Sequence, residues 1–507
     1  MDSILLSLIT FSPLLGLILL AFIPKEQAGT VKLIGILGAL LPLVLSFVMY
    51  AGFTFNQAGL QFHEQFQWFS IPADQVSFPI QYEMGVDGLS MPLVMLAALI
   101  GFFAAVAGAI FIKKRWKEFY ILFFIMLIGM IGVFASQNLF LFFIFFEFTL
   151  IPMFFIMGIW GYVEREQAAF KFLLYNGVGS AIMLIVFVTI FMNVWTLSFS
   201  EIADAFTNPM SPYNVPDAPA YVSEGIRYGL FLALLIAFAI KMPIAPLHTW
   251  MVKAYQESPA PAVLISSGVL IKIGAYGLLR FNVGFFPEVA TDMAQVLAVL
   301  GLINIIYGAL LALVQKSLKL VLAYSSLSHM GIVLLGIASM NAVGFQGAIF
   351  QMVSHGMVAA LLFFIVSIIF ERTSTAELAD LGGLAKSMPF IAGMFLAAAM
   401  ASAGLPGMSG FISEFMAFLG LFGEMPILAA IGTLGIILTA VYLLRAVLGT
   451  TYGPTPERWM GLSDARPLEV LPMVLLLGFI LLIGVYPSVL SDPMQATLQN
   501  IVPKIGG

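Results

Sequence analysis

The sequence predicts an all-α polytopic membrane protein of about 14 transmembrane helices. Of its 507 residues, 61% are hydrophobic and only 9% are charged, whereas soluble domains carry about 25% charged residues. Apolar stretches of about 20 residues, the length that spans a bilayer, recur along the whole chain. The polar connections between them are short, so we expect residues 1–507 to form a single membrane domain.

The apolar stretches divide the chain almost completely. The first lacks a preceding basic segment and is longer than a typical signal-peptide core, so we expect it to remain as the first helix. Reading each stretch as one span gives the ranges 3–23, 31–52, 87–112, 119–135, 138–158, 169–196, 225–247, 259–281, 293–314, 319–338, 343–370, 388–419, 427–449 and 468–488.

Two spans, one in each half of the chain, are interrupted beside a buried ionisable residue. Such a pair is typical of transporters built from inverted repeats. We therefore expect two inverted five-helix repeats, spans 4–8 in 119–281 and spans 9–13 in 293–449, each containing a broken helix. Helices 1–3 with an outside loop at 53–86 would precede them in 1–112, and the last helix and a tail would follow in 468–507.

Lysine and arginine in the connections predict the orientation, because they are enriched on the inner side of a membrane. Sixteen of the 21 such residues lie in the odd-numbered connections, so we expect both termini outside. Alternating residues on both sides of Pro72, Ala73 and Asp74 predict a small hairpin in the first outside loop. We expect this loop and the acidic loop at 198–224 to form a solvated cap.

Several functional classes are excluded by what the sequence lacks. The chain has no cysteine, which excludes disulfides, thiolate metal sites and cysteine-bound iron–sulfur clusters. It has neither a P-loop nor the dinucleotide-binding glycine pattern. The net charge of −5 without a basic run argues against nucleic acid as a partner. We expect no cofactor and no metal in this chain, and a lipid bilayer around it.

Six ionisable residues lie near the middle of apolar spans, where a charge costs about 2.5–3.5 kcal/mol on insertion scales. They are Glu147, Lys241, Lys272, His329, His355 and Glu414. Because groups this costly usually serve transport, we interpret them as a proton path. The alternative interpretation is a set of structural ion pairs and core hydrogen bonds.

The first broken helix contains Lys241. Pro243 and Pro246 lack amide donors and should break the helix after it. Irregular backbone at this depth is tolerated only in protein or beside a watered cavity, so water should reach this lysine. Glu147, flanked by aromatic residues, is the acid expected to pair with it. His248, at the inside end of the span, is a candidate for the proton entrance.

The central candidates are one lysine and two histidines. Lys272 is too far from either end of its span for its ammonium group to reach the surface readily. Each histidine belongs to a polar stripe, because residues three and four apart share a helical face. The stripes are Ser325, Ser328 and His329, and Gln351, Ser354 and His355. Histidine titrates near neutral pH, so we favour a relay over satisfied core histidines or metal ligands.

The second broken helix contains Glu414. Gly404, Pro406 and Gly407 interrupt the span shortly before it. This site, like the one at Lys241, thus combines a helix break with a buried ionisable residue. Ser409 and Ser413 beside the acid also offer oxygen atoms of the kind that sodium prefers.

Six segments resemble a known family. They are Gly-Val-Asp-Gly-Leu-Ser at 85–90, Phe-Phe-Glu at 145–147, Lys-Met-Pro and Pro-Leu-His-Thr-Trp within 241–250, Lys-Ile-Gly-Ala-Tyr-Gly-Leu-Leu-Arg at 272–280, Ala-Tyr-Ser-Ser-Leu-Ser-His-Met-Gly at 323–331 and Gly-Leu-Pro-Gly-Met-Ser-Gly-Phe-Ile-Ser-Glu-Phe at 404–415. Nearly end to end, the chain resembles the antiporter-like membrane subunits of proton-translocating NADH–quinone oxidoreductase (respiratory complex I), which share a superfamily with multisubunit sodium/proton antiporters. Glutamate at position 414, where related branches carry lysine, resembles the M-type (chain 4) branch.

The resemblance implies a division of roles. An acid–lysine pair would take up protons, a central lysine and two histidines would carry them laterally, and a last acid would release them outside. In this sequence, the matching residues are Glu147 and Lys241 for uptake and Glu414 for release. Lys272, His329 and His355 match the groups that carry protons laterally. NADH, FMN, iron–sulfur clusters and quinone would belong to partner subunits. Further antiporter-like subunits would lie on either side, in a bacterial cell membrane.

One segment departs from the family pattern. The family commonly carries aspartate and histidine after span seven, whereas residues 250–259 here read Trp-Met-Val-Lys-Ala-Tyr-Gln-Glu-Ser-Pro. Roles of those two groups at the inner entrance therefore do not transfer. Two alternatives stay open: a sodium/proton antiporter subunit, and a structural membrane subunit without its own channel.

Overall fold

Helices make up most of the computed structural model, which describes residues 4–73, 76–216 and 218–502. The N-terminal part consists of α1 (Leu5–Phe11), α2 (Pro13–Phe22), α3 (Ala28–Gly52), β1 (Gln61–Ala73), β2 (Val76–Val86) and α4 (Met91–Phe111). The next part consists of α5 (Trp116–Ala135), α6 (Leu139–Trp160), α7 (Arg165–Val194), α8 (Phe199–Thr207), α9 (Glu224–Lys241), α10 (Thr249–Glu257), α11 (Ala260–Ile265), η1 (Ser266–Leu270), α12 (Ile271–Gly277) and η2 (Leu278–Val283). The last part consists of α13 (Pro287–Asp292), α14 (Ala294–Val314), α15 (Leu318–Ala338), α16 (Ala342–Thr373), η3 (Leu384–Lys386), α17 (Pro389–Ser402), α18 (Ser409–Glu424), α19 (Pro426–Thr451), η4 (Glu457–Trp459), α20 (Pro467–Val485) and α21 (Ser488–Ile501).

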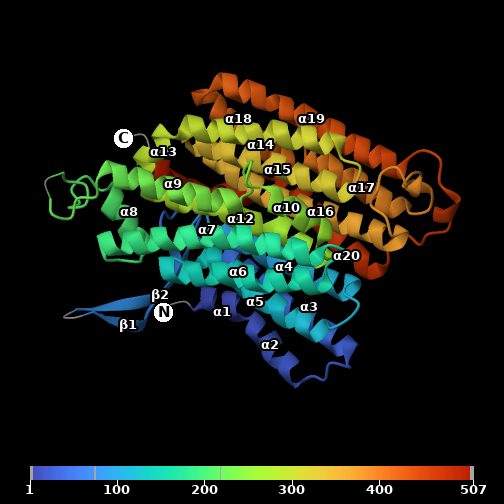
Figure 1. Cartoon of the computed structure of the whole chain (residues 1–507), viewed down its shortest axis with the longest axis horizontal. Coiled ribbons are helices and arrows are strands. Elements are labelled where there is room, and N and C mark those ends of the chain that lie inside the picture. Colours follow the sequence, from blue (N-terminus) through green and yellow to red (C-terminus); the bar gives the residue numbers. More distant parts are fainter. Residues whose placement is uncertain (1–3, 74–75, 217, 503–507) are drawn as a thin grey trace.

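The long helices lie roughly along one common direction (Figure 1). Helices α1–α3 form one edge of the bundle, and α18 with α19 form the opposite edge. Both chain ends lie at the end of the bundle that carries the hairpin and α8. The chain therefore returns to the side from which it started.

Among the described residues, twelve helices are long and apolar enough to cross a membrane, with α1 and α2 forming a single one. The prediction of an all-α polytopic membrane protein is thus confirmed. The other two predicted spans are the interrupted ones, and each appears as two shorter helices in series, α9 with α10 and α17 with α18. The total of fourteen and the inverted relation of the repeats stay predictions.

The hairpin predicted in the first outside loop is present and longer than expected. Its strands pair antiparallel from Gln61 opposite Val86 to Ala73 opposite Val76, and Asp74 lies outside the described residues. Glu64 is fully buried, and its carboxylate accepts hydrogen bonds from the backbone N–H groups of Leu6 and Ser7 at 2.8 and 3.1 Å. Because the first N–H groups of a helix have no partner within it, the hairpin caps α1. This part of the expected solvated cap is therefore packed against the helices.

Three short helices replace segments that we expected to be loop or tail. They are α8 in the acidic loop, α13 after the eighth span and α21 in the C-terminal tail. The backbone N–H of Gly88 donates to Thr497 Oγ1 of α21 at 2.9 Å, so the tail packs against the start of α4. These helices were missed because none is long enough to be recognised as a span.

Helices α14 and α15 approach each other unusually closely. A Cβ atom at Gly301 would lie 2.9 Å from the carbonyl oxygen of Gly331, and one at Gly308 would lie 2.8 Å from the backbone nitrogen of Ser328. Real Cβ atoms do not approach so closely. The two helices are therefore in backbone contact over several turns.

Candidate functional site

The first helix break separates α9 from α10. Lys241 is the last residue of α9, and residues 242–248 connect it to α10. Pro243 and Pro246 lie in this connection, where their missing N–H groups prevent a continuous helix. The predicted end of the span at residue 247 is wrong, because helix resumes after the break and continues to Glu257.

Lys241 is buried, with 1% of its surface exposed. Its Nζ atom lies 3.4 Å from Thr149 Oγ1 and 4.6 Å from the centre of the Phe146 ring. An aromatic face attracts a cation, and the C-terminal end of a helix favours positive charge. The site is therefore built to hold an ammonium group with few hydrogen bonds.

Glu147 does not form the expected direct pair with Lys241. Within the described residues, no ion pair joins the two side chains, and the Oε1 atom of Glu147 is buried without a hydrogen-bond partner. Phe146 and Thr149 share a face of α6 because they are three residues apart, whereas the next residue after Phe146 is rotated by about 100°. That rotation places the half-buried Glu147 beside the exposed residues Phe148 and Ile151. Its charge still acts on Lys241.

His248 lies inside the break, not at the inside end of a span as predicted. It is 4% exposed. Its ring centre is 5.5 Å from that of Tyr307 on α14 and 6.4 Å from that of Tyr324 on α15. The histidine thus lies at the contact between the two halves of the chain. The misplacement follows from ending the span too early.

Lys272 lies in α12, between two π-helical segments, η1 and η2. It is fully buried. Its Nζ atom donates to the carbonyl oxygen of Ser267 and lies 2.8 Å from His355 Nδ1. A π turn leaves carbonyl groups out of the ordinary α-helical pattern, and here one of them accepts from the lysine five residues later.

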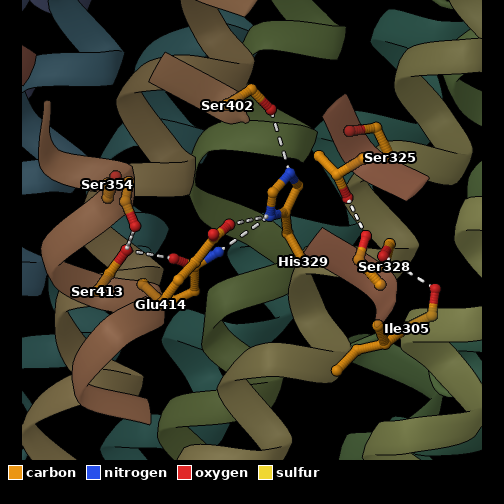
Figure 2. A network of polar contacts seen from close by, with 12 residues as sticks. Ile305, Ser325, Ser328, His329, Ser354, Ser402, Ser413 and Glu414 are labelled. Atoms are coloured by element: carbon orange, nitrogen blue, oxygen red, sulfur yellow. Dashed lines mark hydrogen bonds and ion pairs between the residues drawn. The ribbon is translucent and has the colours of Figure 1, made fainter. Parts of the chain in front are cut away.

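The two histidines continue the path away from Lys272. The ring centres of His355 and His329 are 5.3 Å apart. His329 Nε2 lies 3.1 Å from Ser402 Oγ, and His329 Nδ1 lies 3.1 Å from Gln351 Nε2, as Figure 2 shows for the serine. A cavity of about 10 Å³ beside His355 is lined by Ser402 among others, which is about the size of one water molecule.

Glu414 ends this series of contacts. Its Oε1 atom is 3.6 Å from His329 Nδ1, and the two side chains point toward one another in Figure 2. Ser413 next to it donates to Gln351 Oε1, which joins α18 to α16. The carboxyl group also lines a groove of about 560 Å³ between α18 and α19, together with Phe411 and Phe415.

The second break lies between α17 and α18, in residues 403–408, and contains Gly404, Pro406 and Gly407. Gly404 has a φ of +75° and Gly407 a φ of +90°, which L side chains rarely adopt. A Cβ atom at Gly404 would lie 2.7 Å from Glu414 Oε2. Glycine at this position therefore leaves room for the carboxylate.

The structure brings four of the six predicted ionisable residues into one series: Lys272, His355, His329 and Glu414. In the part of the chain that the structure describes, no hydrogen bond or ion pair joins Lys241 to this series. No three His, Cys, Asp or Glu side chains of the described residues gather as metal ligands. Chemically, the series offers neighbouring groups that can each accept a proton and then donate it.

Sequence reasoning missed uncharged members of both sites. Thr149 contacts Lys241, Ser402 contacts His329, and Asn304 on α14 binds the backbone of the first break. Asn304 had a usable signal, since it is a polar residue in the middle of an apolar span. The serine and threonine had none, because their hydroxyl groups can bond to their own helix.

A buried ion pair at the ends of two spans was also missed. Arg280 donates to both carboxylate oxygens of Asp87, at 2.7 and 2.8 Å. Burial raises the pKa of Asp87, but the charge and hydrogen bonds of Arg280 outweigh it and hold the pKa below its ordinary value. The pair connects the start of α4 to the end of the eighth span.

Models of known families match two adjoining stretches of the chain. Residues 136–439 match the family described as NADH:quinone oxidoreductase/Mrp antiporter, TM. Residues 30–135 match the family described as NADH-ubiquinone oxidoreductase chain 4, amino terminus. The chain therefore belongs to the family of membrane subunits common to NADH:quinone oxidoreductases and Mrp antiporters, as its motifs predicted.

Within this family, the chain is similar to subunits called chain 4 or M. It is 38% identical to NAD(P)H-quinone oxidoreductase chain 4 of Gloeobacter violaceus, over 98% of this chain and 92% of the relative. It is 37% identical to NADH-quinone oxidoreductase subunit M of Rhodobacter capsulatus, over 98% of this chain and 96% of the relative.

Solved structures agree with the fold. A chain of respiratory complex I from Thermus thermophilus with bound NADH superimposes with a TM-score of 0.85 at 28% identity, covering 99% of this chain and all of the other. A chain of the Mrp complex from Dietzia superimposes with a TM-score of 0.82 at 22% identity, covering 100% of this chain and 99% of that chain. The second likeness concerns the fold alone.

Proposed function

We propose that this chain is the M-type proton-translocating membrane subunit of an NADH–quinone oxidoreductase. The observation that carries the proposal is the buried series of side-chain contacts from Lys272 through His355 and His329 to Glu414. The similarity to subunits named chain 4 or M supports the same assignment. Electron transfer would take place in other subunits, which would hold NADH, FMN, iron–sulfur clusters and quinone.

The geometry supports a stepwise transfer. The Lys272 ammonium group gives a proton to His355 Nδ1 across 2.8 Å. The proton passes to His329, and from its Nδ1 atom to Glu414 Oε1 across 3.6 Å. Glu414 releases it through the second break toward the outside. Lys241 takes up the next proton from the inside and recharges Lys272 when the first break moves, with Glu147 and a neighbouring subunit acting on its charge.

The localisation and partners follow from this role. Each half of the chain presents one surface beside an acidic residue. In the first half it is the exposed face of α6 beside Glu147, and in the second half it is the groove on α18 beside Glu414. Each is a place where a further membrane subunit of the complex would pack. We place the chain in a bacterial cell membrane with both termini outside.

The first test is Lys272→Met in the assembled complex, measured in inverted membrane vesicles. Methionine fills a similar volume but carries no proton, so we expect proton pumping per NADH oxidised to fall about 100-fold or more, the range of a lost proton-transfer group. Lys316→Met, which removes an exposed lysine, is the matched control. If the variant complex migrates intact on a native gel and still pumps normally, the proposal fails. The alternative of a structural subunit without its own channel would then replace it. Pumping that requires sodium would favour the sodium/proton antiporter alternative.

A further inference from the structure

Asn304 on α14 binds two backbone polar groups in the first helix break. Its Oδ1 atom accepts a hydrogen bond from the backbone N–H of Ala245 at 2.7 Å, and its Nδ2 atom donates to the carbonyl oxygen of Pro243 at 3.1 Å. These groups lie two residues apart in the connection that follows Lys241. The contact joins helices of the two separate halves of the chain.

The chemistry of this contact is specific to a carboxamide. Asparagine carries a donor and an acceptor on separate atoms of one short side chain. A carboxylate only accepts, leucine does neither, and the single hydroxyl group of serine is too short to reach both backbone groups. Asn304 is fully buried, so no water would replace a lost partner without rearrangement. Trp250 Nε1 supports the same region by donating to the carbonyl oxygen of Ile240 at 2.9 Å.

The helix that carries Asn304 is also joined to the histidine site. The next residue, Ile305, accepts a hydrogen bond through its carbonyl oxygen from Ser328 Oγ at 3.0 Å, and Ser328 precedes His329 (Figure 2). The backbones of α14 and α15 are in contact at Gly301 and Gly308, so we expect the two helices to move together. A displacement of α14 therefore moves α15 and His329 with it.

A second contact points in the same direction. Tyr307 lies three residues after Asn304 on the same face of α14, and its ring faces His248 inside the break. The break in the first half is thus held by the second half through backbone hydrogen bonds and a ring contact, while no side-chain hydrogen bond of the described residues links Lys241 to Lys272.

We propose that Asn304 is a positioning residue that couples the first helix break to the histidine site. It fixes the connection after Lys241 and transmits movement of that connection through α14 and α15 to His329. The two halves of the chain would then change conformation together, even though their proton-carrying groups are not in direct contact. This inference rests on the proposed proton-translocating function.

The test uses the intact complex and hydrogen–deuterium exchange of the backbone. Asn304→Leu keeps the approximate shape and removes both hydrogen bonds. We expect exchange in the segment 242–250 to become about tenfold faster, because a buried N–H loses its partner. Asn304→Ser, which is too short to reach both groups, replaces it if the leucine variant does not assemble.

Asn282→Leu is the matched control. Asn282 is also buried, and it donates a single hydrogen bond to the carbonyl oxygen of Phe231 on α9 at 2.8 Å, away from the break. We expect this variant to leave exchange in 242–250 unchanged. Both variants are then compared for protons pumped per NADH oxidised, which we expect to fall about fivefold in the Asn304 variant alone, within the range for two lost hydrogen bonds.

The outcomes separate this inference from the proposed function. Unchanged exchange in the Asn304 variant would overturn the contact with the break. Faster exchange with a normal pumping ratio, or an equal loss of pumping in the Asn282 control, would overturn the coupling role. The exchange measurement does not depend on pumping, so it holds its meaning even if Lys272→Met leaves pumping intact and the proposed function fails.

Discussion

The two helix breaks each lie beside a buried ionisable residue, but the surroundings of that residue differ. In the first, Lys241 ends the helix before the break, and Thr149 and an aromatic ring are its near neighbours. In the second, Glu414 lies beyond the break in α18, with its Oε1 atom 3.6 Å from His329 Nδ1. Beside it, hydrogen bonds join His329, Gln351 and Ser413. The first site holds its lysine loosely, by one long hydrogen bond and an aromatic ring, and the second places its acid beside a hydrogen-bonded network.

This difference indicates which site can change and which is set in advance. A lysine with one long hydrogen bond can move or lose its proton at small cost. A satisfied buried network is rigid, because breaking any member leaves an unpaired polar group. The first break is therefore suited to respond to a neighbouring subunit, and the second to pass protons in one fixed direction.

Replacing Lys241 should have the largest effect. Lys241→Ala removes the one titratable group that the described residues place at the end of α9 before the break, so we expect pumping per NADH oxidised to fall about 100-fold or more. Inverted vesicles with parallel NADH oxidation give the ratio. Lys253→Ala on α10, which removes a lysine that pairs with Glu164, should leave the ratio near normal. A ratio close to normal in Lys241→Ala would mean that protons enter the series elsewhere.

Replacing Glu414 should have a smaller effect on pumping and little effect on assembly. Glu414→Gln removes the acid, while Ser402 and Gln351 still hold His329 in place. We expect the pumping ratio to fall about tenfold, less than for Lys241→Ala because Glu414 is the last carrier of the series, with normal migration on a native gel. Failure of this variant to assemble would show that the charge itself, and not the surrounding hydrogen bonds, maintains the second site.

Replacing Thr149 should have the smallest effect. Thr149→Val keeps the shape and removes one hydrogen bond of 3.4 Å to Lys241, which corresponds to about a twofold change in pumping. The rate is measured as for the other variants. A loss as large as that of Lys241→Ala would contradict the view that the first site holds its lysine loosely.

Charged residues made the sites predictable from the sequence, and uncharged ones did not. Lys241, Lys272 and Glu414 were found because a charge within an apolar span needs an explanation. Thr149 and Ser402 were missed because hydroxyl groups are common in apolar helices and their partners are fixed only by tertiary packing. The proline and glycine positions located both breaks, since local backbone chemistry acts without tertiary contacts.

The remaining errors have local causes. Whether Glu147 touches Lys241 directly depends on the rotation of α6, which an apolar sequence leaves undetermined because no polar face marks its orientation. His248 was misplaced because helix α10 is too polar to read as part of a span. The hairpin was anticipated from its alternating residues, whereas its role in capping α1 through Glu64 depends on a contact between distant segments.

The π-helical segment η1, which precedes Lys272, sets the direction in which this lysine faces. A π turn contains one residue more than an α turn, so such a segment shifts the phase of the helix by roughly 100° for everything that follows. Deleting one residue from η1 would restore an ordinary helix and rotate Lys272 away from His355, with the composition of the span almost unchanged. The alignment of Lys272 with His355 thus depends on the number of residues in η1. A change of one residue in that length would rotate the lysine away from the histidine.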